Sequence, residues 1–192
     1  MSFFDQPKNA GLALIIVAII SVIAGIANIV LGVIDDAGVQ TANIVIAIGS
    51  IIGAIVYFKY GSSVRSGSVS AKIDILGGFV NAVGIVTIIG GIFTFVAGFV
   101  GYEGGIASGI ISVILGLIIC WCGKKINDGK QTTVDKIIWI ILLVIFIIEL
   151  LLNIVALIGF PIGTILGICG IIIYIFMLTL LFDGEVKKEM GM

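Results

Sequence analysis

The stretch that decides the fold is residues 73–100, which read IDILGGFVNAVGIVTIIGGIFTFVAGFV. Gly77, Gly84, Gly91 and Gly98 recur in it at intervals of seven residues, close to two helical turns, so they form a nearly straight stripe on one face of a helix. In water each glycine inside a helix costs about 1 kcal/mol relative to alanine. In a lipid bilayer, small residues instead let a second helix approach closely. The spacing therefore predicts a membrane helix with a packing seam along its glycines.

The composition of the whole chain agrees with a bilayer environment. Of the 192 residues, 60% are hydrophobic and 11% are charged, whereas soluble domains carry about 25% charged residues. The formal net charge of −1 indicates no affinity for nucleic acid. Histidine is absent, which removes the commonest general base and metal ligand at neutral pH. Cys120 and Cys122 have no further ligands beside them in the sequence, so we expect no metal, no cofactor and no enzymatic activity.

Six apolar stretches are long enough to cross a bilayer, which takes roughly 17–25 residues. They are residues 10–34, 42–58, 73–100, 105–122, 137–158 and 161–182. No polar segment between them is long enough to form a soluble domain, so we expect residues 1–192 to form a single all-α membrane domain.

The basic residues set the expected orientation. All ten lysines and arginines fall in the two tails or in the second and fourth connections, residues 59–72 and 123–136. Connections on the cytoplasmic side of a membrane are enriched in lysine and arginine. We therefore expect a multi-pass protein of the cell membrane with both termini in the cytoplasm.

The chain also repeats internally. Residues 11–36 align without a gap with residues 77–102, and Asn153-Ile-Val matches Asn28-Ile-Val in a third, weaker copy. The repeating unit is a helical hairpin, present at about 10–60, 73–122 and 137–182. Because each unit crosses the membrane twice, all three have the same orientation.

Three hairpins in one short chain, with Gly25-Ile26 and Gly32 recurring as Gly91-Ile92 and Gly98, resemble the HdeD-type short-repeat membrane proteins of prokaryotes. The resemblance implies an envelope protein linked to acid or stress tolerance, with no chemistry assigned to it.

The glycines suggest how the bundle closes. We expect the first and third spans to pack closely through Gly25, Gly32, Gly91 and Gly98, with left-handed crossing as in other heptad repeats. The fifth span has leucines along the matching stripe, and we expect these to fill the space that remains beside the first and third spans.

Polar residues between the glycines are the candidate site. The repeat alignment makes Asn28, Thr94 and Asn153 equivalent and predicts that they lie at one depth. Glu149 lies one helical turn before Asn153 and is the only ionisable residue deep within a span. A charge there costs a few kcal/mol, so we expect the carboxyl to be protonated, paired or in contact with water. It is either a proton- or cation-binding group or a neutral glutamic acid bonded to an asparagine or threonine of a neighbouring helix.

Three function classes follow. The first is an envelope protein that acts through packing or assembly, in line with the resemblance. The second is a channel or transporter for protons, cations or small solutes, centred on Glu149. The third is an accessory subunit of a larger membrane complex. Besides the lipid bilayer, partners would be other copies of the chain or other membrane proteins, reached through small-residue pairs such as Gly49-x3-Gly53 and Gly163-x3-Gly167.

Overall fold

The computed structural model describes residues 6–34, 39–157 and 161–192. Within these ranges, the side chains of residues 31–32, 34, 39–40 and 161–163 are not described. Every regular element within these ranges is a helix. The helices are α1 (Pro7–Ile34), α2 (Val39–Ser66), α3 (Lys72–Gly98), α4 (Gly105–Ile126), α5 (Thr133–Ala156), α6 (Pro161–Phe182) and α7 (Gly184–Glu189). Six of them contain stretches of 19–27 residues long and apolar enough to cross a membrane. The prediction of an all-α membrane protein with six spans is confirmed.

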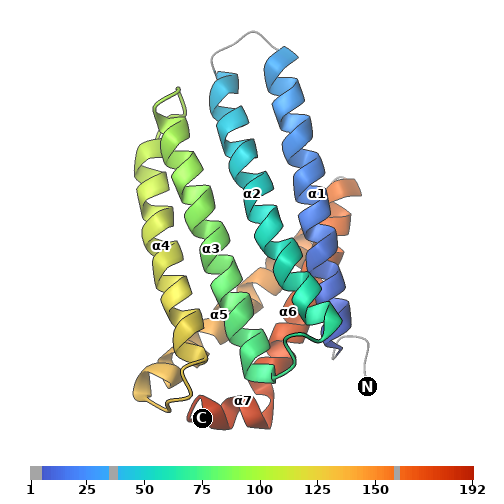
Figure 1. Cartoon of the computed structure of the whole chain (residues 1–192), viewed down its shortest axis with the longest axis vertical. Helices are drawn as coiled ribbons and strands as arrows, with labels where there is room; N and C mark the ends of the chain where they lie inside the picture. Colours follow the sequence, from blue (N-terminus) through green and yellow to red (C-terminus); the bar gives the residue numbers. More distant parts are fainter. Residues whose placement is uncertain (1–5, 35–38, 158–160) are drawn as a thin grey trace.

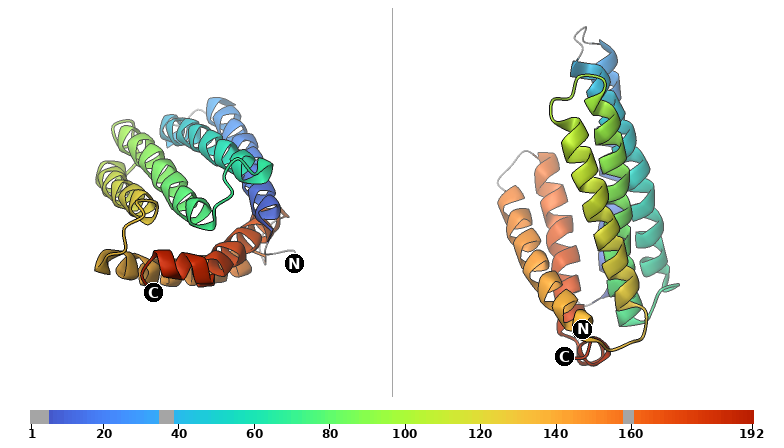
Figure 2. Two further views of the ribbon diagram at one scale, coloured as in Figure 1. Left: turned by 60° about the horizontal axis from the view of Figure 1, so that its bottom comes forward. Right: turned by 90° about the vertical axis from the view of Figure 1, so that its left-hand side faces the viewer.

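The six long helices stand side by side in chain order and form a ring (Figure 1; Figure 2, left). Each packs on the next, and α6 returns to α1. The contact between α4 and α5 is the least extensive in the ring. The α5–α6 hairpin is tilted and covers only the part of the bundle nearer to the chain termini, and α7 lies across that same end (Figure 2, right).

The buried core lies at the end of the bundle that holds both chain termini. It combines the beginnings of α1, α3 and α5 with the ends of α2, α4 and α6, and α7 closes it through Val186 and Met190, each 1% exposed. Towards the other end of the bundle many apolar side chains are exposed; Val33, for example, is 73% exposed and Phe99 is 67% exposed. A bilayer would cover such a surface, whereas soluble monomers rarely expose large continuous apolar patches.

The glycines of α3 face α4, because α4 carries glycines at the same seven-residue spacing. A Cβ added at Gly84 would lie 2.9 Å from the carbonyl oxygen of Gly116, and one added at Gly116 would lie 2.8 Å from that of Gly84. In three further pairs a Cβ added at one or both glycines would meet the backbone of the other: Gly77 with Gly123, Gly91 with Gly109, and Gly98 with Gly105. The two backbones therefore touch along their whole length, which only glycine permits.

The expected packing of the first span on the third is wrong. Among the described residues α1 and α3 do not contact each other, and α1 packs on α2 and α6 instead. Gly25 faces Ala47 and Ile51 of α2, and Gly11 faces Gly61. The surroundings of Gly32 lie outside the description. Small residues on consecutive antiparallel helices thus pair within a hairpin, where the short connection already brings the helices together.

The α5–α6 hairpin is held by larger side chains. The indole Nε1 of Trp139 donates a hydrogen bond to the carbonyl oxygen of Leu181, with a donor–acceptor distance of 2.8 Å. The rings of Phe146 and Tyr174 lie 6.0 Å apart between their centroids. Only towards the far end does a glycine, Gly167, meet the backbone of Asn153. In the described residues the backbones of α5 and α1 do not approach each other. The expected stripe of α5 does reach the core, where Leu143 packs against the buried cluster and the Phe146 ring lies 6.1 Å from that of Phe79 on α3.

Two features expected to serve other roles are internal contacts. Gly49 and Gly53 of α2 face Phe93 and Val86 of α3, so this pair joins two helices of one chain. Trp139 lies near the start of its apolar span, where aromatic residues commonly mark the membrane boundary, yet it is 7% exposed and lies in the core. Gly163 lies outside the described side chains.

A capping arrangement fixes the start of α5. The Asp135 carboxylate is 2% exposed and accepts hydrogen bonds from the backbone N–H of Thr132, at 2.7 Å, and from its hydroxyl, at 2.6 Å. The ammonium of Lys125, at the end of α4, lies 3.7 Å from the same carboxylate. A capping box of this type satisfies the first free N–H groups of a helix, and here it also fixes the turn that joins α4 to α5.

Candidate functional site

Glu149 lies where five helices meet. It is half-buried on α5, and the residues that share a cavity with it come from α1 (Leu14 and Val17), α2 (Tyr57), α3 (Phe79) and α6 (Tyr174). Phe79 is only seven residues beyond Lys72, the first residue of α3, which corresponds to about 10 Å along that helix. The tilt of α5 therefore brings Glu149 to the part of the bundle that lies nearer to the chain termini.

Two tyrosines line the smaller cavity together with Glu149. The side chains of Tyr174 and Glu149 interact directly, and Tyr57 lies close enough to the carboxylate to be affected by its charge. Asn153 is linked to Glu149 through the backbone, because its side-chain nitrogen donates to the carbonyl oxygen of Glu149 at 2.7 Å.

Glu149 also lines two cavities and forms part of the wall between them. The first, of about 230 Å³, faces α1, α2 and α6. The second, of about 400 Å³, lies between α3, α4 and α5. Phe79, Glu149 and Tyr174 line both cavities. The rings of Phe79 and Tyr174 lie 6.1 Å apart between centroids, so this aromatic contact together with the carboxyl separates the two spaces.

The cavities contain no opposite charge for Glu149. Among the described residues that line them, Glu149 is the only charged group, and the other titratable side chains are Tyr57, Tyr174 and Cys122. The remaining lining is almost entirely apolar. An ionised carboxylate in such surroundings is costly unless a cation or a proton neutralises it. The site therefore combines one carboxyl group and two tyrosine hydroxyls with an otherwise largely apolar lining.

The structure brings together only part of the predicted polar set. Asn153 lies beside Glu149, as predicted. Asn28 and Thr94 are not among the described residues that line either cavity. Asn153 shares a cavity with Val17 of α1, and Asn28 lies eleven residues further along that helix, about 16 Å away. The expectation of one common depth is wrong, because the third hairpin is shifted towards the chain termini.

Tyr57 and Tyr174 were missed as members of the site. Tyr57 lies near the end of its apolar stretch, a position typical of aromatic residues at the membrane boundary. Tyr174 did have a signal, because it carries a polar hydroxyl in the middle of an apolar span. Their meeting with Glu149 depends on the tilt of α5 and α6, which no residue pattern specifies.

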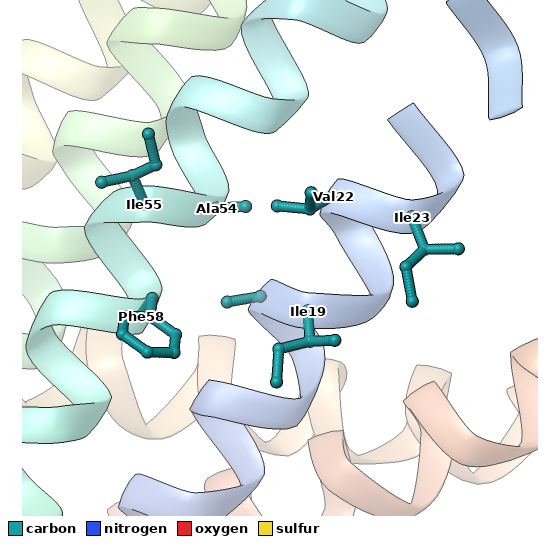
Figure 3. A pocket seen from close by; sticks show the side chains of 7 residues that line it. Ile19, Val22, Ile23, Ala54, Ile55 and Phe58 are labelled. Carbon is teal, nitrogen blue, oxygen red and sulfur yellow. The ribbon is translucent and has the colours of Figure 1, made fainter. Parts of the chain in front are cut away.

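Two other hollows differ from the Glu149 site. Between α1 and α2 an apolar hollow of about 230 Å³ is lined by residues such as Ile19, Ala54 and Phe58, and its side chains are all hydrocarbon (Figure 3). Near the termini, a wider cavity of about 620 Å³ contains Lys59, Asp74 and Asn81. The side-chain oxygen of Asn81 is buried and has no hydrogen-bond partner in the part of the chain that the structure describes. Neither hollow combines depth in the bundle with a charge.

Ion pairs gather at the end with the termini. The Lys72 ammonium lies 2.7 Å from the Asp183 carboxylate and 3.2 Å from that of Glu185, which joins α3 to α7. The hydrogen bond from Lys72 holds the pKa of Asp183 below its ordinary value. Lys125 lowers the pKa of Asp128 in the same way, through a contact of 2.6 Å. These pairs close the core at its polar end and lie away from the Glu149 cavities.

Comparison of the chain with protein-family models, with curated proteins and with solved structures finds no match. The resemblance to HdeD-type proteins stays a prediction.

Proposed function

We propose that this chain is a multi-pass membrane transporter of protons or small cations, and that Glu149 is the group that binds them. The observation that carries the proposal is the position of Glu149. Among the described residues that line the two central cavities it is the only charged one, and it forms part of the wall between them. A carboxyl that contacts one space on each side can accept a cation from the first and release it to the second.

The intramembrane position of the carboxyl supports this function over a purely structural one. Ionisable residues inside membrane spans are costly and commonly mark ion or proton pathways. A structural glutamic acid would be fully enclosed by partners, whereas Glu149 is half-buried and borders open volume on both sides. Tyr174 and Tyr57 supply hydroxyl groups that would stabilise the ionised carboxylate while the proton is absent.

The test is proton flux into liposomes that contain the purified chain. A potassium gradient with valinomycin sets the membrane potential, and a trapped pH dye reports proton entry. We expect flux above that of empty liposomes, with a loss of at least roughly tenfold in Glu149→Gln, which corresponds to about 1.4 kcal/mol. Glu103→Gln removes the same charge from the exposed α3–α4 connection and should leave the flux unchanged.

Equal flux in the wild type and in folded Glu149→Gln would contradict the proposal, as would wild-type flux no higher than that of empty liposomes. Folding of the variant is checked by gel filtration and by its thermal transition in detergent.

The orientation and the repeats complete the proposal. The chain termini lie at one end of the bundle (Figure 1), where the lysines and arginines also lie in the tails and connections. By the positive-inside rule this end would face the cytoplasm. The three hairpins would be copies of one unit whose third member has lost its glycines and gained the carboxyl. Proton binding at Glu149 would also suit the role in acid or stress tolerance that the resemblance implies.

A further inference from the structure

The larger cavity beside Glu149 opens sideways between α4 and α5. Leu115 and Ile118 of α4, together with Ile141 and Ile145 of α5, line this space. The same four residues are 42–51% exposed. The helices make little contact with each other here. A molecule dissolved in the apolar part of the bilayer could therefore reach Glu149 without crossing the polar end of the bundle.

The inner wall of this cavity combines aromatic rings with the carboxyl group. Phe79 and Phe146 lie 6.1 Å apart between ring centroids, and Phe146 and Tyr174 lie 6.0 Å apart. All three rings line the cavity that contains Glu149. Aromatic rings attract cations within about 6 Å of their centres, and desolvation strengthens this attraction. Such rings also pack well against apolar groups, so they favour a cation whose charge is surrounded by hydrocarbon.

The volume of the cavity suits a small organic molecule. At about 400 Å³, it falls within the range of roughly 300–1,000 Å³ that is typical of small-molecule sites. A bare metal ion would need several oxygen ligands, and the lining supplies few beyond Glu149, Tyr174 and Thr87. The Thr87 hydroxyl already donates to the carbonyl oxygen of Val83 at 2.9 Å.

We propose that the cavity between α4 and α5 binds a hydrophobic organic monocation, which enters from the bilayer and pairs with Glu149. This inference rests on the proposed function and specifies its ligand class. Binding to the protonated site releases one proton from the Glu149 carboxyl for each cation bound, so the charge of the site is unchanged. Tyr57 from α2 and Tyr174 from α6 interact with this carboxyl. Cys122 from α4 is the other titratable group that lines the cavities, and the described lining residues of α1 and α3 add no charge.

Two ions of nearly equal shape and opposite charge provide the test. Tetraphenylphosphonium is a hydrophobic cation, and tetraphenylborate is its anionic counterpart. Titration calorimetry of the purified chain in detergent measures the binding of each, and a pH dye in weak buffer measures proton release. We expect tetraphenylphosphonium to bind with release of a proton and to bind more tightly than tetraphenylborate. Its affinity should fall at least roughly tenfold in Glu149→Gln, the factor given by about 1.4 kcal/mol of lost attraction.

A second pair of variants places the ligand in this cavity. Ile145→Trp would fill the space between α4 and α5 and should weaken tetraphenylphosphonium binding while leaving Glu149 in place. Ile140→Trp makes the same change at a side chain of α5 that is 53% exposed and does not line the cavity, and it should have no effect.

The outcomes separate this inference from the proposed function. If both ions bind equally, or if binding of the cation persists in Glu149→Gln, the cavity holds apolar molecules of any charge, such as lipid acyl chains, and the inference is overturned. Glu149-dependent proton flux without tetraphenylphosphonium binding would also overturn it, and would leave the proposed function intact. Charge-selective binding without any proton flux would support the inference and contradict the proposed function.

Discussion

The α3–α4 hairpin and the α5–α6 hairpin each pack two antiparallel helices against each other, the first through glycines and the second through large side chains. In the first, four pairs of glycines bring two backbones into contact along their whole length. In the second, Trp139, Phe146 and Asn153 stand at seven-residue intervals on the face of α5 that meets α6. The helix contact between α3 and α4 is accordingly much more extensive than that between α5 and α6.

The difference shows how one chain can combine a rigid part with a site. Without a hydrophobic effect between lipid-exposed helices, close packing and interhelical hydrogen bonds hold membrane helices together. Glycine pairs give the closest packing, but they leave no volume for a ligand. Large side chains hold α5 and α6 further apart, and cavities remain on both sides of Glu149. The hairpin that departs from glycine packing is therefore the one that carries the charge.

The largest effect is expected where the glycine contact is broken. A Cβ at Gly91 would lie 2.8 Å from the backbone nitrogen of Val113 and 2.9 Å from the carbonyl oxygen of Gly109. Gly91→Leu should therefore lower the free energy of unfolding by about 3 kcal/mol or more, since backbone atoms cannot yield. Thermal or denaturant unfolding in detergent measures the loss.

Gly90→Leu is the matched control, because a Cβ at the adjacent Gly90 meets no atom within 4 Å. If Gly91→Leu were as stable as Gly90→Leu, the α3–α4 contact would not hold the hairpin together.

A smaller effect is expected from the side-chain bond that joins α5 to α6. Trp139→Phe keeps an aromatic ring in the core and removes the hydrogen bond to Leu181. The buried carbonyl oxygen loses its donor, so the free energy of unfolding should fall by about 1–3 kcal/mol. Trp121→Phe makes the same change at a ring of α4 that is 54% exposed, and should leave the thermal transition unchanged. Equal transitions for the two variants would show that this hydrogen bond adds nothing to the hairpin.

The smallest effect is expected at the ion pair that closes the end of the bundle. Asp183→Asn keeps an N-cap acceptor for the backbone N–H of Glu185 and removes the charge that pairs with Lys72. Because the pKa of Asp183 is lowered in the folded protein, the pair stabilises the fold above the ordinary pKa of aspartate, about 3.9. This contribution is lost as the pH falls through the lowered pKa.

Thermal unfolding at several pH values checks this prediction. The wild type should be slightly more stable than Asp183→Asn at neutral pH, and the two should converge in strong acid. If the stability advantage of the wild type over Asp183→Asn grew as the pH fell, the result would contradict a stabilising Lys72–Asp183 ion pair.

The architecture was largely predictable from sequence, because the thickness of a bilayer fixes how long an apolar stretch must be to cross it. Each stretch of sufficient length could therefore be identified as a span. The seam along Gly77 to Gly98 was also predictable, but its partner was misassigned. Gly109, Gly116 and Gly123 have the same spacing and are adjacent in the chain, and a short connection brings consecutive helices together before any others. Glu149 could be found because a carboxyl in an apolar span is exceptional.

The surroundings of Glu149 could not be predicted in the same way. Residue patterns determine which face of a helix is small or polar, but they do not determine its tilt. The shift of the third hairpin towards the chain termini places Asn153 beside Val17 and takes it away from the levels of Asn28 and Thr94. The contacts that accompany this tilt, such as those of Trp139 with Leu181 and of Phe146 with Phe79, join residues far apart in the sequence.

The central claim is that the hairpin without glycine pairing holds a carboxyl group that exchanges its proton. Infrared difference spectroscopy tests this directly, because a protonated carboxyl has a C=O stretching band that disappears on ionisation. We predict that raising the pH of the membrane-reconstituted chain removes a carboxyl band in the wild type that is absent at every pH in Glu149→Gln. Identical difference spectra for the two proteins would contradict the claim.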